Sequence, residues 1–278
     1  MADFGLKSSR KKKMKYIFRF LLCLFVYSFG HATQQKEIFV VIPSFNNIEW
    51  YQRNLDSVIS QNYSNWKAFY IDDCSTDGTA AAVTRYIQEK NLSNSIYLIK
   101  NKQRKGALYN LYTIISNAPD HAIIVTVDGD DWLAGNNVLA RINQEYSERD
   151  AWMTYGQYQI YPDGGICCWR PVPDSIVAAN SFRENFWYTS HLRTFYAWLF
   201  KKIHKKDLMH KGEFFAVTWD MAFMFPMLEM AGSHAHHIPE VLYVYNQANQ
   251  INDYKIRLPL VLEMDKLIRS KKKYERIT

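Results

Sequence analysis

Residues 122–131 read AIIVTVDGDD, a stretch that combines an apolar strand with a cluster of acids. Its first six residues are apolar or β-branched, as a strand buried on both faces of a sheet requires. Its last four residues place Asp128, Asp130 and Asp131 directly after that strand. Crowded carboxylates are costly unless a cation neutralises them, so the stretch predicts a site for Mg²⁺ or Mn²⁺. A turn followed by a capping aspartate explains the same residues equally well.

The region upstream repeats the order of apolar strand, polar turn and amphipathic helix. The expected strands are 38–43, 66–71, 95–99 and 122–127, and the expected helices are 48–60, 77–90, 106–117 and 135–149. This alternation is typical of a doubly wound parallel sheet, in which ligands bind at the carboxyl ends of the strands. No GxGxxG or P-loop motif is present, which disfavours the standard dinucleotide and P-loop functions.

The second half of the chain lacks this regular alternation. The expected strands are 151–161, 165–169 and 238–245, and the expected helices are 183–203, 218–231 and 258–277. No linker separates the halves, so we expect them to share one core.

Four segments, taken together, resemble the family 2 glycosyltransferases. They are IFVVIPSFNN, IDDCSTDGT, NKQRKGALYN and VDGDDWL, which span roughly residues 38–135. The resemblance implies an α/β fold of the GT-A type, with a Rossmann-like, mostly parallel sheet, helices on both faces and a mixed acceptor-side subdomain. It also implies a single catalytic domain over 33–278. Its expected parts are a nucleotide-sugar half over 38–131, an acceptor half over 132–257 and a C-terminal helix over 258–278.

The resemblance further implies which residues bind the donor. They are Pro43, Phe45, Asn46, Asp72, Asp73, Arg104, Lys105 and Asp128. Asp73 corresponds to the family's carboxylate that meets the base, and Asp72 is its neighbour. Arg104 and Lys105 precede a helix start, where cations and free N–H groups favour phosphate. Asp128 and Asp130 match the Asp-x-Asp motif that holds a divalent metal.

The catalytic candidate lies in the second half of the chain. Asp220 begins an expected helix, as does the family's acidic motif that carries the catalytic base, although an aspartate favoured by the helix dipole is the plainer explanation. His191, Arg193 and Trp219 are weaker candidates for contact with the acceptor or the diphosphate. Many relatives have a late histidine as a further metal ligand, but residues 245–249, YNQAN, offer none. His234, His236 and His237 are expected on the surface or in a loop.

The resemblance thus implies a metal-dependent glycosyltransferase of the hexosyltransferase class. One carboxylate base, with no second nucleophile, predicts inversion at the anomeric carbon. The expected partners are a nucleotide-sugar donor and a glycan, lipid or protein acceptor. Two alternatives stay open: a catalytically silent module that binds nucleotide or carbohydrate, and a nucleotidyltransferase.

The N-terminal segment carries most of the net charge. Residues 1–32 hold seven basic residues and one acidic residue, whereas the remainder holds 27 basic and 26 acidic residues. We therefore expect no nucleic-acid partner. The apolar run over 20–30 predicts either a signal peptide cleaved after Ala32 or an uncleaved signal-anchor. The protein is thus expected to be exported or membrane-associated through its N-terminus.

Overall fold

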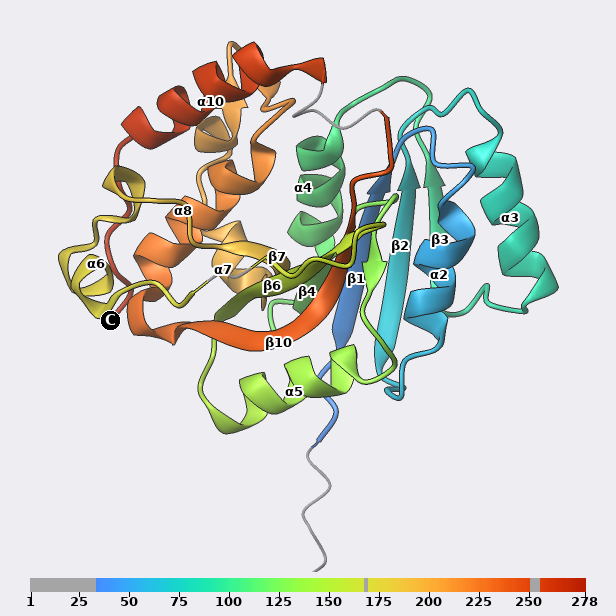
Figure 1. Cartoon of the computed structure of the whole chain (residues 1–278), viewed down its shortest axis with the longest axis horizontal. Helices are drawn as coiled ribbons and strands as arrows, with labels where there is room; N and C mark the ends of the chain where they lie inside the picture. Colours follow the sequence, from blue (N-terminus) through green and yellow to red (C-terminus); the bar gives the residue numbers. More distant parts are fainter. Residues whose placement is uncertain (1–33, 168–169, 251–255) are drawn as a thin grey trace, which may run out of the picture. The chain divides into compact units, whose positions relative to one another are not determined.

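Four parallel strands form one side of an eight-stranded sheet, drawn from blue to green in Figure 1. They are β1 (Ile38–Ser44), β2 (Trp66–Asp72), β3 (Ile96–Lys100) and β4 (Ile123–Thr126). The computed structural model describes residues 34–167, 170–250 and 256–278. Residues Gln35–Thr278 form one compact unit. The expected signal peptide or signal-anchor lies outside the described residues. Within the described ranges, no helix is long and apolar enough to cross a membrane.

The other side of the sheet is mixed, which gives the strand order β3-β2-β1-β4-β7-β6-β10-β5. Its strands are β5 (Trp132–Leu133), β6 (Met153–Tyr161), β7 (Ser190–Tyr196) and β10 (Ala235–Asn246). β7 runs antiparallel to both β4 and β6, while β10 is parallel to β6 and antiparallel to β5. β7 therefore joins the parallel half to the mixed half.

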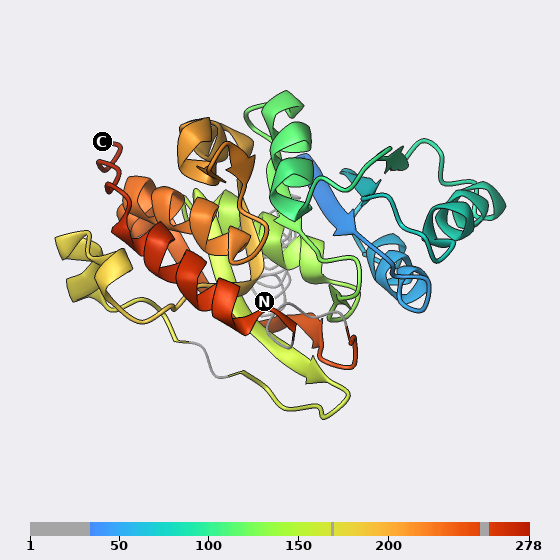
Figure 2. The ribbon, with the colours of Figure 1, turned by 90° about the horizontal axis from the view of Figure 1, so that it is seen from above.

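Helices cover both faces of the sheet because alternate strand residues point to opposite sides. In β1, Ile38, Val40 and Ile42 pack with α2 (Tyr51–Ile59), α3 (Thr79–Glu89) and α5 (Val138–Glu148). Phe39 and Val41 pack instead with α4 (Ala107–Asn117), α7 (Ala197–Lys201), α8 (Trp219–Ala231) and α10 (Leu258–Ser270). Figure 2 shows α2 and α4 on opposite sides of β1. This arrangement matches the expected fold class.

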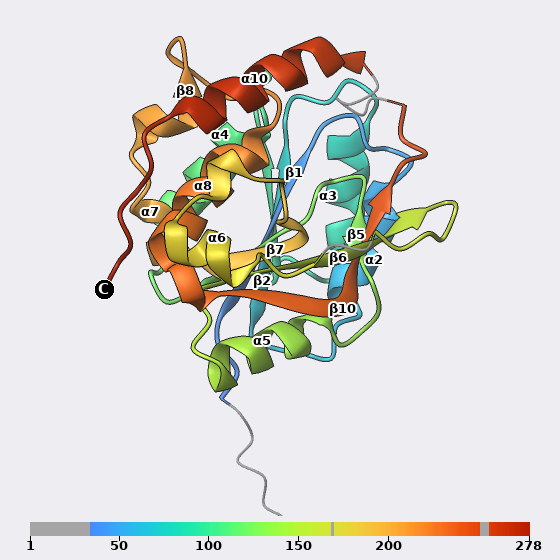
Figure 3. The same cartoon turned by 60° about the vertical axis from the view of Figure 1, so that its left-hand side comes forward.

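Short elements complete the acceptor side. They are α6 (Asp174–Ala179), η1 (Phe182–Glu184), η2 (Lys205–Leu208), β8 (Met209–His210), β9 (Glu213–Phe214) and η3 (Gly232–His234). Figure 3 shows β8 beside α10 and α6 beside α8.

Three expectations for the second half are wrong. The helix expected over 183–203 is instead η1, β7 and α7, because pairing with β4 and β6 on both sides overrides the local helical spacing. The strand expected over 165–169 is reduced, in its described part, to one bridge between Ile166 and Gln159. The final helix ends at Ser270, and the segment after it packs on α8, where the Ile277 N–H donates to the Met230 carbonyl at 3.0 Å.

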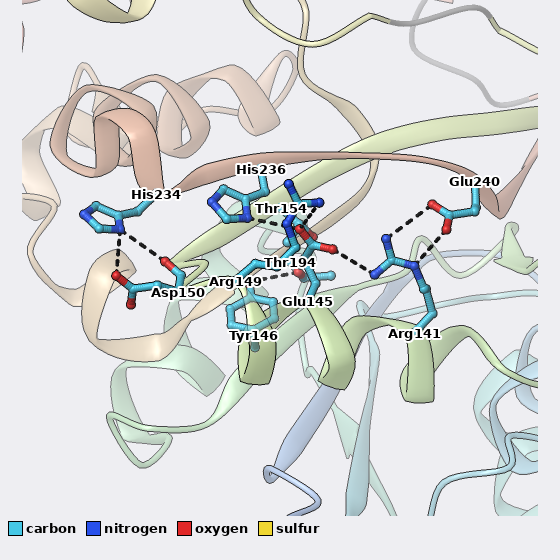
Figure 4. Close-up of polar contacts among 10 residues, drawn as sticks. All are labelled: Arg141, Glu145, Tyr146, Arg149, Asp150, Thr154, Thr194, His234, His236 and Glu240. Carbon is cyan, nitrogen blue, oxygen red and sulfur yellow. Dashed lines mark hydrogen bonds and ion pairs between the residues drawn. The ribbon is translucent and has the colours of Figure 1, made fainter. Parts of the chain in front are cut away.

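The histidines expected on the surface or in a loop lie instead in η3 and β10. His234 stacks on Trp152 with ring centroids 4.0 Å apart. His236 Nδ1 lies 3.0 Å from Oε1 of the buried Glu145, which also pairs with Arg141 (Figure 4). The His236 contact ties β10 to α5, and the His234 stack holds η3 against Trp152, so both histidines have structural roles away from the aspartate cluster.

Candidate active site

The site lies where β1, β2 and β4 end at the same edge of the sheet. The register places Ser44 opposite Asp72, and Val41 opposite Thr126, two residues before Asp128. Gly129 closes this edge, because its N–H donates to the Pro43 carbonyl at 3.0 Å. A Cβ on Gly129 would lie 2.6 Å from Ser44 Oγ, so no other residue allows β1 and the acidic turn to approach so closely.

The aspartates after β4 form a crowded cluster in which Asp128 and Asp130 are half-buried and Asp131 is buried. Asp131 is fully buried, with Oδ2 accepting a hydrogen bond from Tyr243 Oη and Oδ1 accepting one from the Asn246 N–H, both at 2.7 Å. Burial and the charges of Asp130 and Asp128 nevertheless raise the pKa of Asp131 well above its usual range. Asp130 Oδ2 accepts from Asn249 Nδ2 at 2.7 Å. The cluster thus favours a positive partner.

His191 faces this cluster from β7. Its Nε2 lies 3.6 Å from Asp128 Oδ2 and has no hydrogen-bond partner among the described residues. Burial and the nearby Arg193 lower the pKa of His191 well below its usual range, which favours the neutral imidazole. Burial also raises the pKa of Asp128, an effect that Arg193 opposes. Ligand atoms of Asp128, Asp131 and His191 all lie within 4.8 Å of one another.

Stacking fixes the orientation of that imidazole. The Tyr243 ring lies 4.5 Å from the His191 ring at an interplanar angle of 10°, and the Tyr245 ring lies 5.6 Å away. A neutral, oriented imidazole beside carboxylates provides nitrogen and oxygen ligands suited to Mn²⁺.

Asp220 reaches the same region through Arg193. Arg193 Nη2 donates to Asp220 Oδ2 at 2.8 Å, joining β7 to the first turn of α8. The Arg193 side chain is buried, and its Nε has no partner within the described residues. The guanidinium lies 5.8 Å from the centre of the Trp219 ring. The structure thus brings together candidates from two separate elements. Asp220 and Trp219 come from α8, and Arg193 and His191 come from β7.

Two other acids of the second half, Glu229 and Glu213, are weaker choices for the base because their surroundings differ. Glu229 is fully buried and accepts from Arg183 Nη2 at 2.9 Å, and its charge is therefore committed to a structural pair. Glu213 is exposed in β9.

Asp72 ends β2 and Asp73 follows it, but the two acids have different surroundings. Asp73 Oδ1 accepts from the Lys105 N–H at 2.9 Å, and its Oδ2 accepts from the Gly106 N–H at 2.8 Å. Both oxygens of Asp73 therefore hold the turn before α4. Asp72 Oδ2 accepts from the Ser75 N–H at 3.2 Å, while its Oδ1 is buried without a hydrogen-bond partner in the described ranges. Asp72 is thus the acid with an oxygen left to accept from a ligand.

The remaining donor-side candidates lie near the same edge of the sheet. The Arg104 guanidinium lies 3.8 Å from the centre of the Phe45 ring. The Asn46 side chain accepts from the Thr76 N–H at 2.9 Å and so joins the loops after β1 and β2. Pro43 is buried within β1, and Lys105 Nζ lies 5.5 Å from the Tyr109 ring centre. The structure therefore offers Phe45 and Arg104 to a ligand more directly than Pro43 or Asn46.

The comparison with protein families agrees with this geometry. The family model described as Glycosyl transferase family 2 matches residues 39–219, which is more than half of the chain. The chain belongs to glycosyltransferase family 2. This membership disfavours both alternatives considered from the sequence.

Individual relatives support the same family and fold. The chain is 28% identical over 127 residues to the UDP-Glc:alpha-D-GlcNAc-diphosphoundecaprenol beta-1,3-glucosyltransferase WfgD of Escherichia coli. That match covers 46% of this chain and 47% of WfgD, so the chain spans about half of that relative's length.

Two solved structures show the GT-A fold. The mannosyltransferase PcManGT from Pyrobaculum calidifontis, in complex with GDP-Man and Mn²⁺, matches at 21% identity and a TM-score of 0.59, over 87% of this chain and 67% of that one. S. aureus TarS 1–349 with UDP-GlcNAc matches at 15% identity and a TM-score of 0.54, over 76% of this chain and 58% of that one.

The sequence analysis of this family 2 protein did not predict the residues that contact the aspartate cluster. Tyr243, Asn246 and Asn249 contact the cluster from the end of β10. Asn54 Nδ2, in α2, donates to the carbonyls of Asp128 and Asp131 at 3.0 and 2.8 Å. The apolar run over 238–245 ends in polar residues, as the run before Asp128 does, and this signal could have identified Asn246 and Asn249. No comparable signal marks Asn54.

Proposed function

We propose that this protein transfers a sugar from a nucleotide-sugar donor to an acceptor hydroxyl, with a divalent metal and with inversion. One observation carries the proposal: Arg193 pairs with Asp220 and also acts electrostatically on Asp128, so a candidate base and the acidic cluster share one site. The names of the relatives support it, because WfgD uses UDP-Glc, TarS was solved with UDP-GlcNAc and PcManGT with GDP-Man.

The residues present fit a divalent metal. The 3.6 Å between His191 Nε2 and Asp128 Oδ2 is long for a hydrogen bond. The two atoms are close enough for one cation to bind both, and Nε2 has no hydrogen-bond partner among the described residues. Asp128 and His191 would hold the ion, with Asp130 as the second acid of the Asp-x-Asp motif. When bound, the cation would stabilise negative charge on the departing nucleoside diphosphate.

The donor side supplies recognition of the nucleotide. Asp72 Oδ1 is buried and has no hydrogen-bond partner among the described residues, so it is suited to accept a hydrogen bond from the N–H of a base. Arg104, held over the Phe45 ring, is placed to bind a phosphate or to extend a flat surface beside the base. In this assignment Asp73 is a positioning residue, since its oxygens already accept from the Lys105 and Gly106 N–H groups.

The acceptor side supplies the base. As the acceptor oxygen forms its bond to the anomeric carbon, Asp220 takes the hydroxyl proton, and the bond from that carbon to the diphosphate oxygen breaks. Arg193 binds Asp220 Oδ2 and fixes the carboxylate, while the described residues provide no hydrogen bond to Oδ1. A single displacement with one base produces inversion.

The test is a donor screen. The protein is incubated with UDP- and GDP-sugars, Mn²⁺ and candidate acceptors, and the released nucleoside diphosphate and the product linkage are measured. We expect release that depends on both metal and acceptor, and a product whose anomeric configuration is opposite to that of the donor. Retained configuration would contradict the role of Asp220 as the base. Release of pyrophosphate instead would indicate nucleotidyl transfer.

A further inference from the structure

The first turns of α10, together with Ile256 just before the helix, expose large apolar side chains to solvent. Of the eight exposed large hydrophobic residues in the described part of the chain, four fall within one short stretch, which we call the α10 ridge: Ile256, Leu258, Leu260 and Leu262. Leu258 and Leu262 are four residues apart, so they lie on one side of the helix, with the exposed Lys266 next in the row. Val261, Met264 and Ile268 form the buried face.

The α10 ridge lies next to the acceptor side of the site. Thr218 Oγ1 donates to the Val261 carbonyl at 3.3 Å, which connects α10 to the residue two positions before Asp220. Figures 1 and 3 show α10 on the side of the sheet toward which the arrowheads of β1 and β2 point. An apolar partner on the α10 ridge would therefore lie at the same edge of the sheet as the candidate base.

Basic residues are concentrated around α10. Residues 201–211 hold five lysines and one aspartate, and residues 257–276 hold seven basic and three acidic residues. The rest of 33–278 holds fifteen basic and 22 acidic residues. The two basic segments meet, because Lys271 Nζ donates to the Met209 carbonyl at 3.3 Å and Tyr274 Oη donates to Asp207 Oδ2 at 2.7 Å. The near-neutral body thus has one strongly basic region beside an apolar ridge.

We propose that the α10 ridge and these basic segments dock the protein on an anionic bilayer, which presents a membrane-borne acceptor to Asp220. Exposed leucines beside lysines match a surface that offers both acyl chains and anionic headgroups. A soluble polyanion would leave the leucines without a partner. A second copy of the chain, or its own basic residues 1–32, would bring positive charge against positive charge. The docking surface stands independently of the proposed function, and only the acceptor that it delivers rests on that function.

The experiment measures the partition coefficient of the full-length chain on vesicles, without donor or metal. The vesicles contain either phosphatidylcholine alone or phosphatidylcholine mixed with phosphatidylglycerol. The variant Leu258→Ser with Leu262→Ser removes exposed apolar groups, and Lys206→Gln with Lys272→Gln removes exposed charges. The matched control, Tyr97→Ser with Ile166→Ser, removes comparably exposed apolar groups on β3 and beside β6.

We expect the leucine variant to bind mixed vesicles about tenfold or more weakly than the wild type. The control should bind like the wild type, and the lysine variant should lose most of the preference for anionic vesicles. Wild-type binding by the leucine variant would overturn the proposal. A wild-type dimer that the leucine variant converts to monomers in the absence of lipid would assign the α10 ridge to a second copy instead. Equal loss of binding by the control would show that general surface hydrophobicity is responsible.

Discussion

The donor side, from β1 to β4, and the acceptor side, from β6 to β10, hold their acids in different ways. Asp73 accepts from two backbone N–H groups, whereas Asp220 and Glu229 each pair with an arginine side chain. A backbone N–H exists at any residue except proline, so Asp73 can hold the turn before α4 whatever side chains that turn carries. An acceptor-side acid needs a particular partner on another element. Replacing Asp73 should therefore leave neutral N–H donors unpaired. Replacing Asp220 or Glu229 should instead leave the positive charge of an arginine without its partner.

The largest effect is expected at Asp220. Asp220→Asn keeps the shape of the side chain but cannot accept the acceptor's proton, so turnover should fall about 10²–10⁴-fold. The donor contacts are in the other half of the site, so donor affinity should change little. Turnover and calorimetric donor affinity are measured together.

The control for that variant is Asp174→Asn, which alters another aspartate in the first turn of a helix. It should retain wild-type turnover. If Asp220→Asn keeps more than about a tenth of wild-type turnover, the base is another residue.

Breaking the buried acceptor-side ion pair should destabilise the fold far more than breaking an exposed pair. Glu229→Gln leaves the charge of Arg183 buried without its partner, so the free energy of unfolding should fall by about 3–5 kcal/mol. Glu184→Gln breaks an exposed pair with Lys273 and should cost less than about 1 kcal/mol. Denaturant unfolding of both variants measures the difference, and equal losses would contradict the contrast between the two pairs.

Replacing His191 tests whether the mixed half of the sheet contributes to the metal site. His191→Gln removes the imidazole that faces Asp128, so Mn²⁺ affinity measured by calorimetry or electron paramagnetic resonance should fall at least about tenfold. The matched control is His236→Gln, because His236 contacts Glu145 and not the aspartate cluster. Unchanged Mn²⁺ affinity in His191→Gln would show that the ligand set is made of oxygens alone.

The smallest effects are expected from replacing two adjacent acids of the donor side, and they distinguish the roles of these acids. Asp72→Asn should weaken nucleoside diphosphate binding about tenfold with little change in the free energy of unfolding. Asp73→Asn leaves N–H groups of the α4 turn without an acceptor, so it should lower that free energy by about 1–3 kcal/mol. The reverse pattern would return the base-binding role to Asp73.

The same contrast explains how far the sequence could predict the structure. On the donor side, the apolar run ending at Val127 and the acids that follow it fix both the strand and its polar end. β7 was predicted as a helix, because its place between β4 and β6 depends on residues far along the chain. The contact between Arg193 and Asp220 depends on that strand. His191 was identified only as a weak candidate, because its approach to Asp128 follows from the same pairing and from no local pattern.

The most direct test of the account is calorimetry of nucleoside diphosphate binding, with Mn²⁺ and with a chelator. UDP and GDP are each titrated into the full-length protein, and the tighter ligand is then repeated with Asp130→Asn. The account predicts that the chelator abolishes most of the affinity and that Asp130→Asn weakens binding in Mn²⁺. Equal affinity with Mn²⁺ and with chelator would contradict the metal site at Asp128, Asp130 and His191.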